Sequence, residues 1–336
     1  MTKSSVTSTD VARLADVSQS AVSRTFTPGA SVSEKTRERV LAAARELGYR
    51  PNALARSLIS GRSRIIGLVV AYLENHFYPI VIEKLSRSLQ AEGYHVLLFM
   101  TETGQQDEVI KEILQYQVDG VVMASVTLSS HIAQECAGLG VPVVLFNRYI
   151  PDSQASAVVS DNIRGGCLLA ELLVSEGHKD IAFIAGQENS STNVEREKGF
   201  NEGLAAAGLH VSRRTVGNYT FEDAAIAARA ILSDGTPDAI FVANDHMAFA
   251  VMDVIRGEFG LKIPEDISVV GYDNVPEAGW PSYNLTTVEQ SVDEMIAATV
   301  EILLEQMEHK QVTATKRVTA ASLIVRGSTR TTIEGS

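Results

Sequence analysis

The chain has 336 residues, of which 45% are apolar, so it is long enough for two or three folded units and too apolar to be disordered. It contains two cysteines and no metal-ligand spacing, which argues against a disulfide-rich fold and against a metal site. No apolar run is long enough to span a bilayer, and the polar first ten residues lack the core of a signal peptide. We therefore expect a cytoplasmic protein that has no membrane partner.

Charge is distributed unevenly along the chain. Residues 1–64 hold eleven Lys and Arg against five Asp and Glu, a formal net charge of +6, whereas the remainder carries −18. A basic segment at one end of an acidic chain is typical of a protein that contacts a polyanion with that end. Charge alone leaves open that the segment is an ordinary solvated helical surface.

The N-terminal segment has the pattern of three short helices. A Thr-x-x-Asp capping box at Thr7 opens the first, and Ser18 and Ser33 are expected N-caps of the second and third. Gly48 ends the third helix, as glycine ends many helices. Two short helices joined by a three-residue turn, in a basic segment, are typical of a helix–turn–helix DNA-binding unit.

Residues 52–60, NALARSLIS, have a helical composition but are too few to form a stable helix alone. We expect this segment to fold only against a partner surface. Residues 61–64, Gly-Arg-Ser-Arg, follow it as a linker.

From Ile65 onward, short β-branched runs alternate with helical stretches. Apolar strands between helices indicate a parallel sheet that is covered by helices on both faces. Two such series follow one another, so we expect two doubly wound lobes. The expected helices of these lobes span residues 79–92, 105–117, 130–139, 164–176, 194–207, 222–232, 245–259 and 292–308.

Ordered motifs along nearly the whole chain resemble those of the LacI/GalR family of bacterial transcription regulators. They include DVARLADVSQSAVSRTF (10–26), VSEKTRERVLAAARELGYRPNALARSL (32–58), IGLVV (66–70), VPVVLFNR (141–148), SDNIRGG (160–166), VANDHMA (242–248) and PEDISVVGYDN (264–274). The resemblance implies an all-α helix-turn-helix DNA-binding domain, followed by an α/β periplasmic-binding-protein-like core of two doubly wound parallel-sheet lobes.

The same resemblance implies the domain boundaries. We expect the helix-turn-helix domain at residues 1–50, a hinge helix and linker at 51–63, an effector-binding and dimerisation core at 64–328, and a tail at 329–336. Within the core, the N-lobe is expected at 64–159 and 290–318, and the C-lobe at 160–289 and 319–328.

The resemblance also implies which residues contact DNA. Gln19, Ser20 and Arg24 match the base-reading positions of the second helix, and Arg and Gln side chains can bind guanine and adenine in the major groove. Leu58 matches a leucine that the family's hinge helix inserts into the minor groove. The alternatives are that Gln19 and Ser20 are ordinary exposed polar residues, and that Leu58 packs on its own domain.

A small effector is expected between the two lobes, because that is where the family binds it. The matching effector positions are Phe77, Tyr78, Asn147, Thr192, Arg196, Tyr219, Asn244 and Asp273. Polar side chains of these types satisfy vicinal hydroxyls, and aromatic rings cover the C–H faces of a sugar ring. For Arg196 and Asp273 the alternative is an interlobe or structural ion pair.

Three positions depart from the family pattern. Asp16 replaces the glycine usual in the turn of the first two helices, and Asp tolerates left-handed backbone better than most residues. His76 stands where many members have proline, and a capping or surface role is favoured over effector contact. Asn147 replaces the aspartate of some sugar-binding members, which weakens any specific effector assignment.

These features together predict a sequence-specific DNA-binding transcriptional regulator, a repressor of carbohydrate catabolism or transport genes under allosteric control by a small sugar or sugar derivative. The expected partner is a pseudo-palindromic operator bound by a homodimer, since residues 326–336 lack the apolar heptad repeat of family tetramers. No cofactor is expected.

Two other classes of protein compete with this interpretation. A periplasmic-type sugar-binding protein without DNA function would have a signal peptide and no basic head. An enzyme on a doubly wound fold would show a P-loop, a G-x-G-x-x-G turn, an H-E-x-x-H helix or a G-x-S-x-G elbow, and the sequence has none of these.

Overall fold

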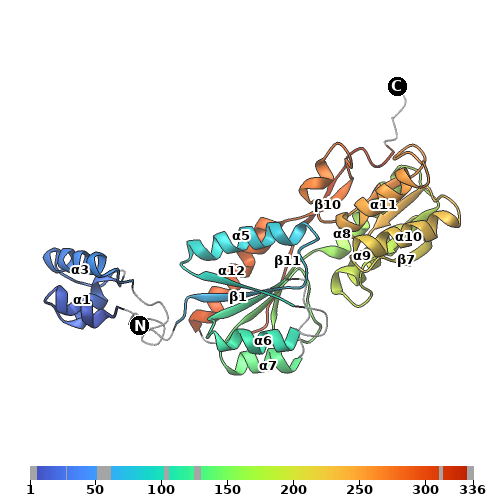
Figure 1. The fold of residues 1–336 in the computed structure, drawn as a ribbon. Coiled ribbons are helices and arrows are strands. Elements are labelled where there is room, and N and C mark those ends of the chain that lie inside the picture. The colour runs from blue at the N-terminus through green and yellow to red at the C-terminus, as the bar shows by residue number, and fades with distance from the viewer. Residues whose placement is uncertain are drawn as a thin grey trace. The chain divides into compact units, whose positions relative to one another are not determined.

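The structure is a computed structural model that describes residues 6–27, 29–50, 62–101, 106–124, 130–309 and 313–330. The chain forms two compact units, Met1–Ser63, called the head, and Arg64–Ser336, called the core (Figure 1). The predicted hinge helix and Leu58 lie outside the described residues. Within the described ranges, no helix has the length and apolar character needed to cross a membrane.

Within its described residues, 6–27, 29–50 and 62–63, the head has three helices, as predicted. They are α1 (Ser8–Leu14), α2 (Gln19–Thr25) and α3 (Glu34–Leu47). The predicted caps are confirmed, because the side chains of Thr7, Ser18 and Ser33 each accept a hydrogen bond from a backbone N–H in the first turn of their helix. Gly48 ends α3 with a left-handed backbone, φ 67°.

The turn between α1 and α2 needs a residue in the left-handed region. Asp16 adopts φ 50° there, a conformation that its short polar side chain tolerates. Arg39 of α3 donates hydrogen bonds to the backbone carbonyl of Asp16, at 3.0 Å, and to its carboxylate, at 3.2 Å. The third helix therefore fixes the turn that sets the angle between the first two.

The N-lobe of the core is a six-stranded parallel sheet with strand order β11-β5-β4-β3-β1-β2. Its strands are β1 (Ile65–Val70), β2 (His95–Met100), β3 (Gly120–Ala124), β4 (Val143–Phe146), β5 (Ser156–Ser160) and β11 (Lys316–Thr319). Helices α5 (Phe77–Ala91) and α12 (Val292–His309) cover one face, and α6 (Gln106–Gln115) and α7 (Ser130–Gly138) cover the other (Figure 1). The central strands β3 and β4 are buried throughout, which explains their continuous apolar sequences.

The C-lobe has a four-stranded parallel sheet in the order β7-β6-β8-β9. Its strands are β6 (Ile181–Ala185), β7 (Val211–Val216), β8 (Ala239–Val242) and β9 (Ser268–Val270). Its helices are α8 (Asn162–Ser175), α9 (Ser191–Ala206), α10 (Phe221–Ser233), α11 (Asp245–Gly257) and the short 3-10 helix η1 (Pro276–Gly279). An antiparallel pair, β10 (Thr287–Gln290) and β12 (Ala321–Ile324), completes the lobe.

Two glycines allow α8 and α9 to pack at very short range. A Cβ at Gly166 would lie 2.3 Å from the carbonyl oxygen of Arg196, and a Cβ at Gly199 would lie 1.9 Å from that of Ile163. No side chain fits at either position, so the glycines fix the distance between the helices. This packing holds α9, and the residues on its first two turns, in place.

The chain passes between the lobes three times, from β5 to α8, from β10 to α12, and from β11 to β12. Most predicted helices of the core agree with the observed ones to within two residues. The exception is α9, which begins at Ser191 and not at 194, because the Ser190 hydroxyl caps it by accepting from the N–H of Asn193. Thr192 therefore lies in the first turn of a helix.

Candidate nucleic-acid interface and ligand cavity

The exposed face of α2 carries the three residues predicted to read bases. Gln19, Ser20 and Arg24 are exposed, whereas Ala21 and Val22 are buried in the head core. Gln19 donates a hydrogen bond to the Ser8 hydroxyl at 2.9 Å. The guanidinium of Arg24 has no hydrogen-bond partner within the described part of the chain, so it is available to a ligand.

The rest of the head holds α2 in position. Val11, Val22 and Val40 each come from a different helix and are at most 1% exposed. Arg37 of α3 donates to the carbonyl oxygen of Thr25 at 3.2 Å, at the end of α2. A short helix with a fixed orientation and a free polar face has the geometry needed to enter a major groove.

A small polar cavity lies between the two lobes of the core. The residues that line it are Tyr72, Asn75, Tyr78, Asn147, Arg148, Thr192, Arg196, Tyr219, Asn244 and Asp273. Its volume of about 10 Å³ leaves room for about one water molecule. We call it the polar cavity, and its own side chains fill it in this closed arrangement of the lobes.

Seven of the eight predicted effector residues meet in the polar cavity, and Phe77 is the exception. Phe77 lines a second, larger space, although Tyr78 beside it lines the polar cavity. Successive residues at the start of a helix point about 100° apart, so the two rings face different spaces. Three further lining residues, Tyr72, Asn75 and Arg148, were not predicted from the sequence. Asn75 and Arg148 are polar residues that follow the buried strands β1 and β4, and this position in the chain could have indicated them.

Arg196 is the centre of the polar cavity. It is 2% exposed and donates to Asn162 Oδ1 at 3.0 Å, to the carbonyl oxygen of Ala243 at 2.6 Å and to Asp273 Oδ1 at 3.1 Å. Its guanidinium lies 3.7 Å from the centroid of the Tyr272 ring. All three of these acceptors belong to the C-lobe, so that lobe orients the charge before any ligand binds.

Asp273 faces Arg196 from the loop after β9. Burial raises the pKa of its carboxyl group, and the nearby Arg196 charge and the hydrogen bonds from Gln290 and Asn75 oppose that rise. The backbone φ of Asp273 is 119°, a strained value for a residue other than glycine. The pair is an ion pair within the C-lobe, so the interlobe alternative raised from the sequence is wrong, while a structural role remains compatible with ligand binding.

Several polar groups in the cavity lack a partner among the described residues. Asn147, with φ 69°, donates from Nδ2 to the Tyr78 hydroxyl at 3.4 Å, but its Oδ1 is buried without a hydrogen bond. Arg148 Nε is also buried and unpaired. Buried polar atoms are normally satisfied, so these orphaned groups indicate a site that is completed by a ligand or by water.

The other cavity residues are held by one another. The hydroxyls of Thr192 and Tyr219 are 3.0 Å apart, and the guanidinium of Arg148 lies 5.5 Å from the centroid of the Tyr219 ring. Asn244 uses its Oδ1 to cap α11, accepting from the N–H of Met247 at 3.0 Å. Asn244 also lines the polar cavity, and its Nδ2 remains as a donor group.

Polar contacts on the rim join the two lobes. His76 Nδ1 lies 2.9 Å from Glu277 Oε1, which gives His76 the surface role expected for it. The Tyr149 N–H donates to the Ser191 hydroxyl at 3.1 Å, and Lys316 Nζ lies 3.5 Å from Glu195 Oε1. These contacts hold the lobes closed over the polar cavity.

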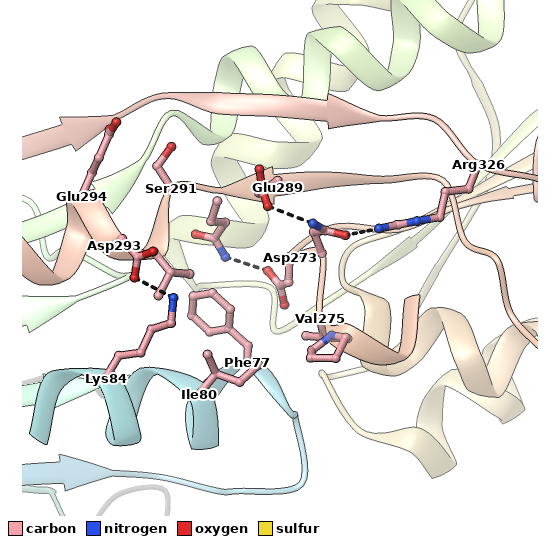
Figure 2. A pocket seen from close by; sticks show the side chains of 14 residues that line it. Phe77, Ile80, Lys84, Asp273, Val275, Glu289, Ser291, Asp293, Glu294 and Arg326 are labelled. Carbon is pink, nitrogen blue, oxygen red and sulfur yellow. Dashed lines mark hydrogen bonds and ion pairs between the residues drawn. The ribbon is translucent and has the colours of Figure 1, made fainter. Parts of the chain in front are cut away.

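The larger space, called the larger cavity, has a volume of about 580 Å³ and shares Asp273 with the polar cavity. Figure 2 shows its walls, with Phe77 and Lys84 from the N-lobe opposite Asp273 and Val275 from the C-lobe. Across the described residues, no group of three or more His, Cys, Asp or Glu has an arrangement suited to a metal ion. The geometry is that of a binding site for a polar small molecule.

Two family models match the chain. One, described as bacterial regulatory proteins of the lacI family, matches residues 7–52, and the other, described as a periplasmic binding protein-like domain, matches residues 170–329. The first covers the helices of the head, and the second covers most of the C-lobe together with α12 and the last strands.

Curated relatives match over nearly the full length. The HTH-type transcriptional regulator CelR of Thermobifida fusca is 34% identical over 332 residues, which span 95% of this chain and 96% of that protein. The HTH-type transcriptional repressor PurR of Vibrio campbellii is 34% identical over 310 residues, 90% of this chain and 92% of the relative.

Solved structures agree with these matches. A complex of the transcriptional regulator CelR with cellobiose is 31% identical, covers 96% of this chain and 99% of its own, and has a TM-score of 0.73. The Lac repressor dimer bound to operator and the anti-inducer ONPF is 29% identical, covers 97% and 99%, and has a TM-score of 0.87.

Proposed function

Because the chain belongs to the LacI family and is a DNA-binding transcriptional repressor, not an enzyme, we propose that it controls genes of carbohydrate catabolism or transport. It acts as a homodimer on a pseudo-palindromic operator. A small sugar or sugar derivative is its effector and binds among the residues of the polar cavity, which must widen to admit it because its present volume is about 10 Å³. Gln19, Ser20 and Arg24 read bases, and Leu58 contacts the minor groove.

One observation carries the effector proposal. Seven predicted residues from distant parts of the chain converge around the buried Arg196–Asp273 pair, and Asn147 Oδ1 is left without a partner beside them. Amide, carboxylate and guanidinium groups bind vicinal hydroxyls, and the Tyr78 and Tyr219 rings pack on a sugar's C–H face. Carbohydrate complexes of CelR and of the Lac repressor, the latter with ONPG, support this chemistry in relatives.

We infer that effector and operator are coupled through a change in how the two lobes close. A ligand that separates or tightens the lobes changes the spacing of the two N-lobes in the dimer, and so of the two hinge segments at residues 52–60. A ligand shifts such an equilibrium only by its difference in affinity for the two states, typically about 1–3 kcal/mol. Reciprocity requires operator DNA to change effector affinity by the same factor.

Calorimetric titration of effector, with and without operator, tests this proposal after a thermal-shift screen of sugars, sugar acids and polyols has supplied the ligand. Asp273→Asn should abolish the effector response while operator affinity without effector stays near that of the native protein. Leu58→Ala should lower operator affinity while effector affinity of the free protein stays unchanged. Asp234→Asn, an exposed carboxylate at the end of α10, is the matched control.

Two results would contradict the proposal. One is a normal effector response from Asp273→Asn. The other is loss of effector binding in DNA-free Leu58→Ala, because that would place Leu58 in the effector site and not in the operator contact.

A further inference from the structure

Glu195, on the second turn of α9, bonds to residues of both lobes. Its side chain is 14% exposed, and its Oε1 lies 3.5 Å from Lys316 Nζ of the N-lobe. Its Oε2 accepts a hydrogen bond from Asn162 Nδ2 of the C-lobe at 3.3 Å. Glu195 is not among the residues that line the polar cavity, so any effect that it has on that cavity must pass through another side chain.

Two N-lobe residues close on the Glu195 carboxylate. Lys316 is the first residue of β11, and its Nζ lies 3.3 Å from the centroid of the Tyr149 ring. Burial and a hydrogen bond with Glu195 raise the pKa of the Tyr149 hydroxyl, because loss of its proton would place a second negative charge beside the carboxylate. A cation and a hydroxyl of one lobe therefore meet a single carboxylate of the other lobe.

Asn162 connects Glu195 to the cation of the polar cavity. It is 1% exposed and is the first residue of α8, directly after the crossover from β5. Its Nδ2 donates to the carbonyl oxygen of Ser160 at 3.1 Å as well as to Glu195, and its Oδ1 accepts from Arg196 Nε at 3.0 Å. Because both N–H groups of the amide are engaged, its oxygen is held toward the guanidinium. Glu195 thus helps to hold an acceptor that orients Arg196.

This chain of contacts depends on how the lobes close. When the lobes separate, Lys316 and Tyr149 move with the N-lobe, whereas the other members of the chain remain in the C-lobe. The Glu195 side chain then regains rotamer freedom, which is large for a long flexible side chain. A mobile carboxylate no longer offers the Asn162 amide a fixed acceptor.

We propose that Glu195 is a positioning residue that couples closure of the lobes to the orientation of Arg196. In the closed arrangement, Lys316 and Tyr149 fix the Glu195 carboxylate, the carboxylate fixes the Asn162 amide, and the amide holds Arg196 Nε. Separation of the lobes releases the first of these contacts and so loosens the last. This inference rests on the proposed effector site, because it makes the orientation of that site's cation depend on closure.

The first test measures lobe separation in the full-length protein without ligand. Glu112→Cys on α6 and Ala205→Cys on α9 place spin labels at exposed positions of the two lobes, in a Cys136→Ala, Cys167→Ala background. Pulsed electron paramagnetic resonance, on labelled protein diluted with unlabelled protein, gives the distance between the labels within one chain. Lys316→Met should add a second population of distances, because it removes the cation that joins the lobes at Glu195.

Two further variants show whether the charge of Lys316 is the cause. Lys316→Arg should restore the native distances, because a guanidinium also pairs with a carboxylate and stacks on an aromatic ring. Lys198→Met is the matched control, since Lys198 is an exposed lysine of α9 that lies 3.9 Å from Glu202 of the same helix. Native distances in Lys316→Met, or an equal change in Lys198→Met, would overturn the inference.

The second test follows the Arg196 side chain by NMR of isotope-labelled arginine. The Arg196 Nε–H signal is assigned by its absence in Arg196→Lys, and its exchange with solvent reports how firmly Asn162 holds it. Glu195→Met removes the acceptor of Asn162 as well as the contact with Lys316, whereas Lys316→Met removes only that contact. Divided by each variant's fraction of separated lobes, exchange should be about tenfold faster in Glu195→Met than in Lys316→Met, the effect of losing one hydrogen bond to a charged group.

The conservative variant separates positioning from closure. Glu195→Gln loses the charge that pairs with Lys316 but keeps an oxygen that accepts from Asn162, so its divided exchange rate should equal that of Lys316→Met. Equal rates in Glu195→Met and Lys316→Met would show that Glu195 acts only on closure and would overturn the inference. If Glu195→Met is unfolded by circular dichroism, Glu195→Ala replaces it. Both tests use protein without ligand, so their failure leaves the proposed effector site in place, and that site is tested separately by the ligand screen and by Asp273→Asn.

Discussion

The DNA-reading face of the head and the polar cavity of the core are built in opposite ways. Gln19, Ser20 and Arg24 lie within six residues on one short helix and are all exposed. Gln19 donates to the Ser8 hydroxyl at 2.9 Å and the Ser18 and Ser20 hydroxyls are 2.9 Å apart, so these side chains are bonded only to neighbouring surface hydroxyls. The cavity residues come from both lobes, and Arg196 and Asp273 are buried and bonded to each other. The exposed face of α2 makes only surface contacts, whereas the cavity residues are buried and bonded to one another, so substitutions in the cavity should also affect stability.

Removing Arg196 should produce the largest effect. Arg196→Met deletes the partner of the buried Asp273 carboxylate and should lower the free energy of unfolding by about 3–5 kcal/mol, since an uncompensated buried charge remains. Urea unfolding of the full-length protein measures this loss. Arg164→Met, which removes an exposed pair with Glu171, is the control and should change the stability little.

If Arg196→Met lost no more stability than Arg164→Met, the contrast between the preorganised cavity and the exposed α2 face would be wrong. That result would mean that the cavity network contributes as little to the fold as a surface ion pair. The cavity would then resemble the head, with its groups free to rearrange around a ligand.

Arg24→Ala tests the head. The structure leaves its guanidinium exposed and unpaired, so the substitution should leave the unfolding midpoint unchanged. Operator affinity should fall by about 1–3 kcal/mol, with relaxed specificity at one base pair. Fluorescence anisotropy with operator and random duplexes measures this, and an equal loss on both duplexes would show that Arg24 contacts phosphate and reads no base.

The two sites differ in how far the sequence alone could predict them. The cap at Ser18 fixes where α2 begins, and the apolar Ala21 and Val22 fix its buried face, so the sequence alone places Gln19, Ser20 and Arg24 on the exposed face. The cavity residues lie far apart in the chain, and only a resemblance to a family could group them.

What the sequence could not predict depends on the closure of the lobes. Phe77 and Tyr78 are neighbours in the chain, but Phe77 lines the larger cavity and Tyr78 the polar cavity. Their rings point in different directions because α5 begins at Phe77. The Oε1 of Gln290, which is unpaired among the described residues, and the size of the larger cavity both arise where two lobes and a crossover meet. Residue types and spacing carry no information on such a junction.

Titration of buried and exposed carboxyl groups extends the comparison to pH. Burial raises the pKa of Asp245 in the core well above its usual range, and the Asp273 charge adds to the rise. Hydrogen bonds from Thr7 lower the pKa of Asp10 in the head. Asp245 therefore stabilises the folded state at low pH, and this stabilisation is lost as pH rises from about 4 toward the folded-state pKa. Asp10 stabilises the folded state above about pH 4, and this stabilisation is lost as pH falls.

Asp245→Asn should remove that dependence. An amide at this position can still accept from the Val275 N–H and can donate to the Thr287 hydroxyl, the two groups that now bond to the carboxyl. The variant should gain stability over the native protein as pH rises above about 4, by up to about 1.4 kcal/mol per pH unit. Urea unfolding across that pH range measures this gain in stability. Asp10→Asn should show the opposite pH dependence: its α1 should open more easily than that of the native protein above about pH 4, as measured by hydrogen exchange.

The smallest expected effect comes from a helix cap in the head. The Ser33 hydroxyl accepts from the Thr36 N–H at 3.3 Å, and Ser33→Ala leaves that N–H without a partner at the start of α3. The loss should be about 1 kcal/mol in the opening free energy of α3, measured by amide hydrogen exchange, and Ser33→Asp should restore it because aspartate is also a good N-cap. Since α3 holds the end of α2 through Arg37, operator affinity should fall slightly in Ser33→Ala, whereas effector affinity should not change. A change in effector affinity would show that the head and the core are coupled even without DNA. The α2 surface and the polar cavity would then not be independent sites.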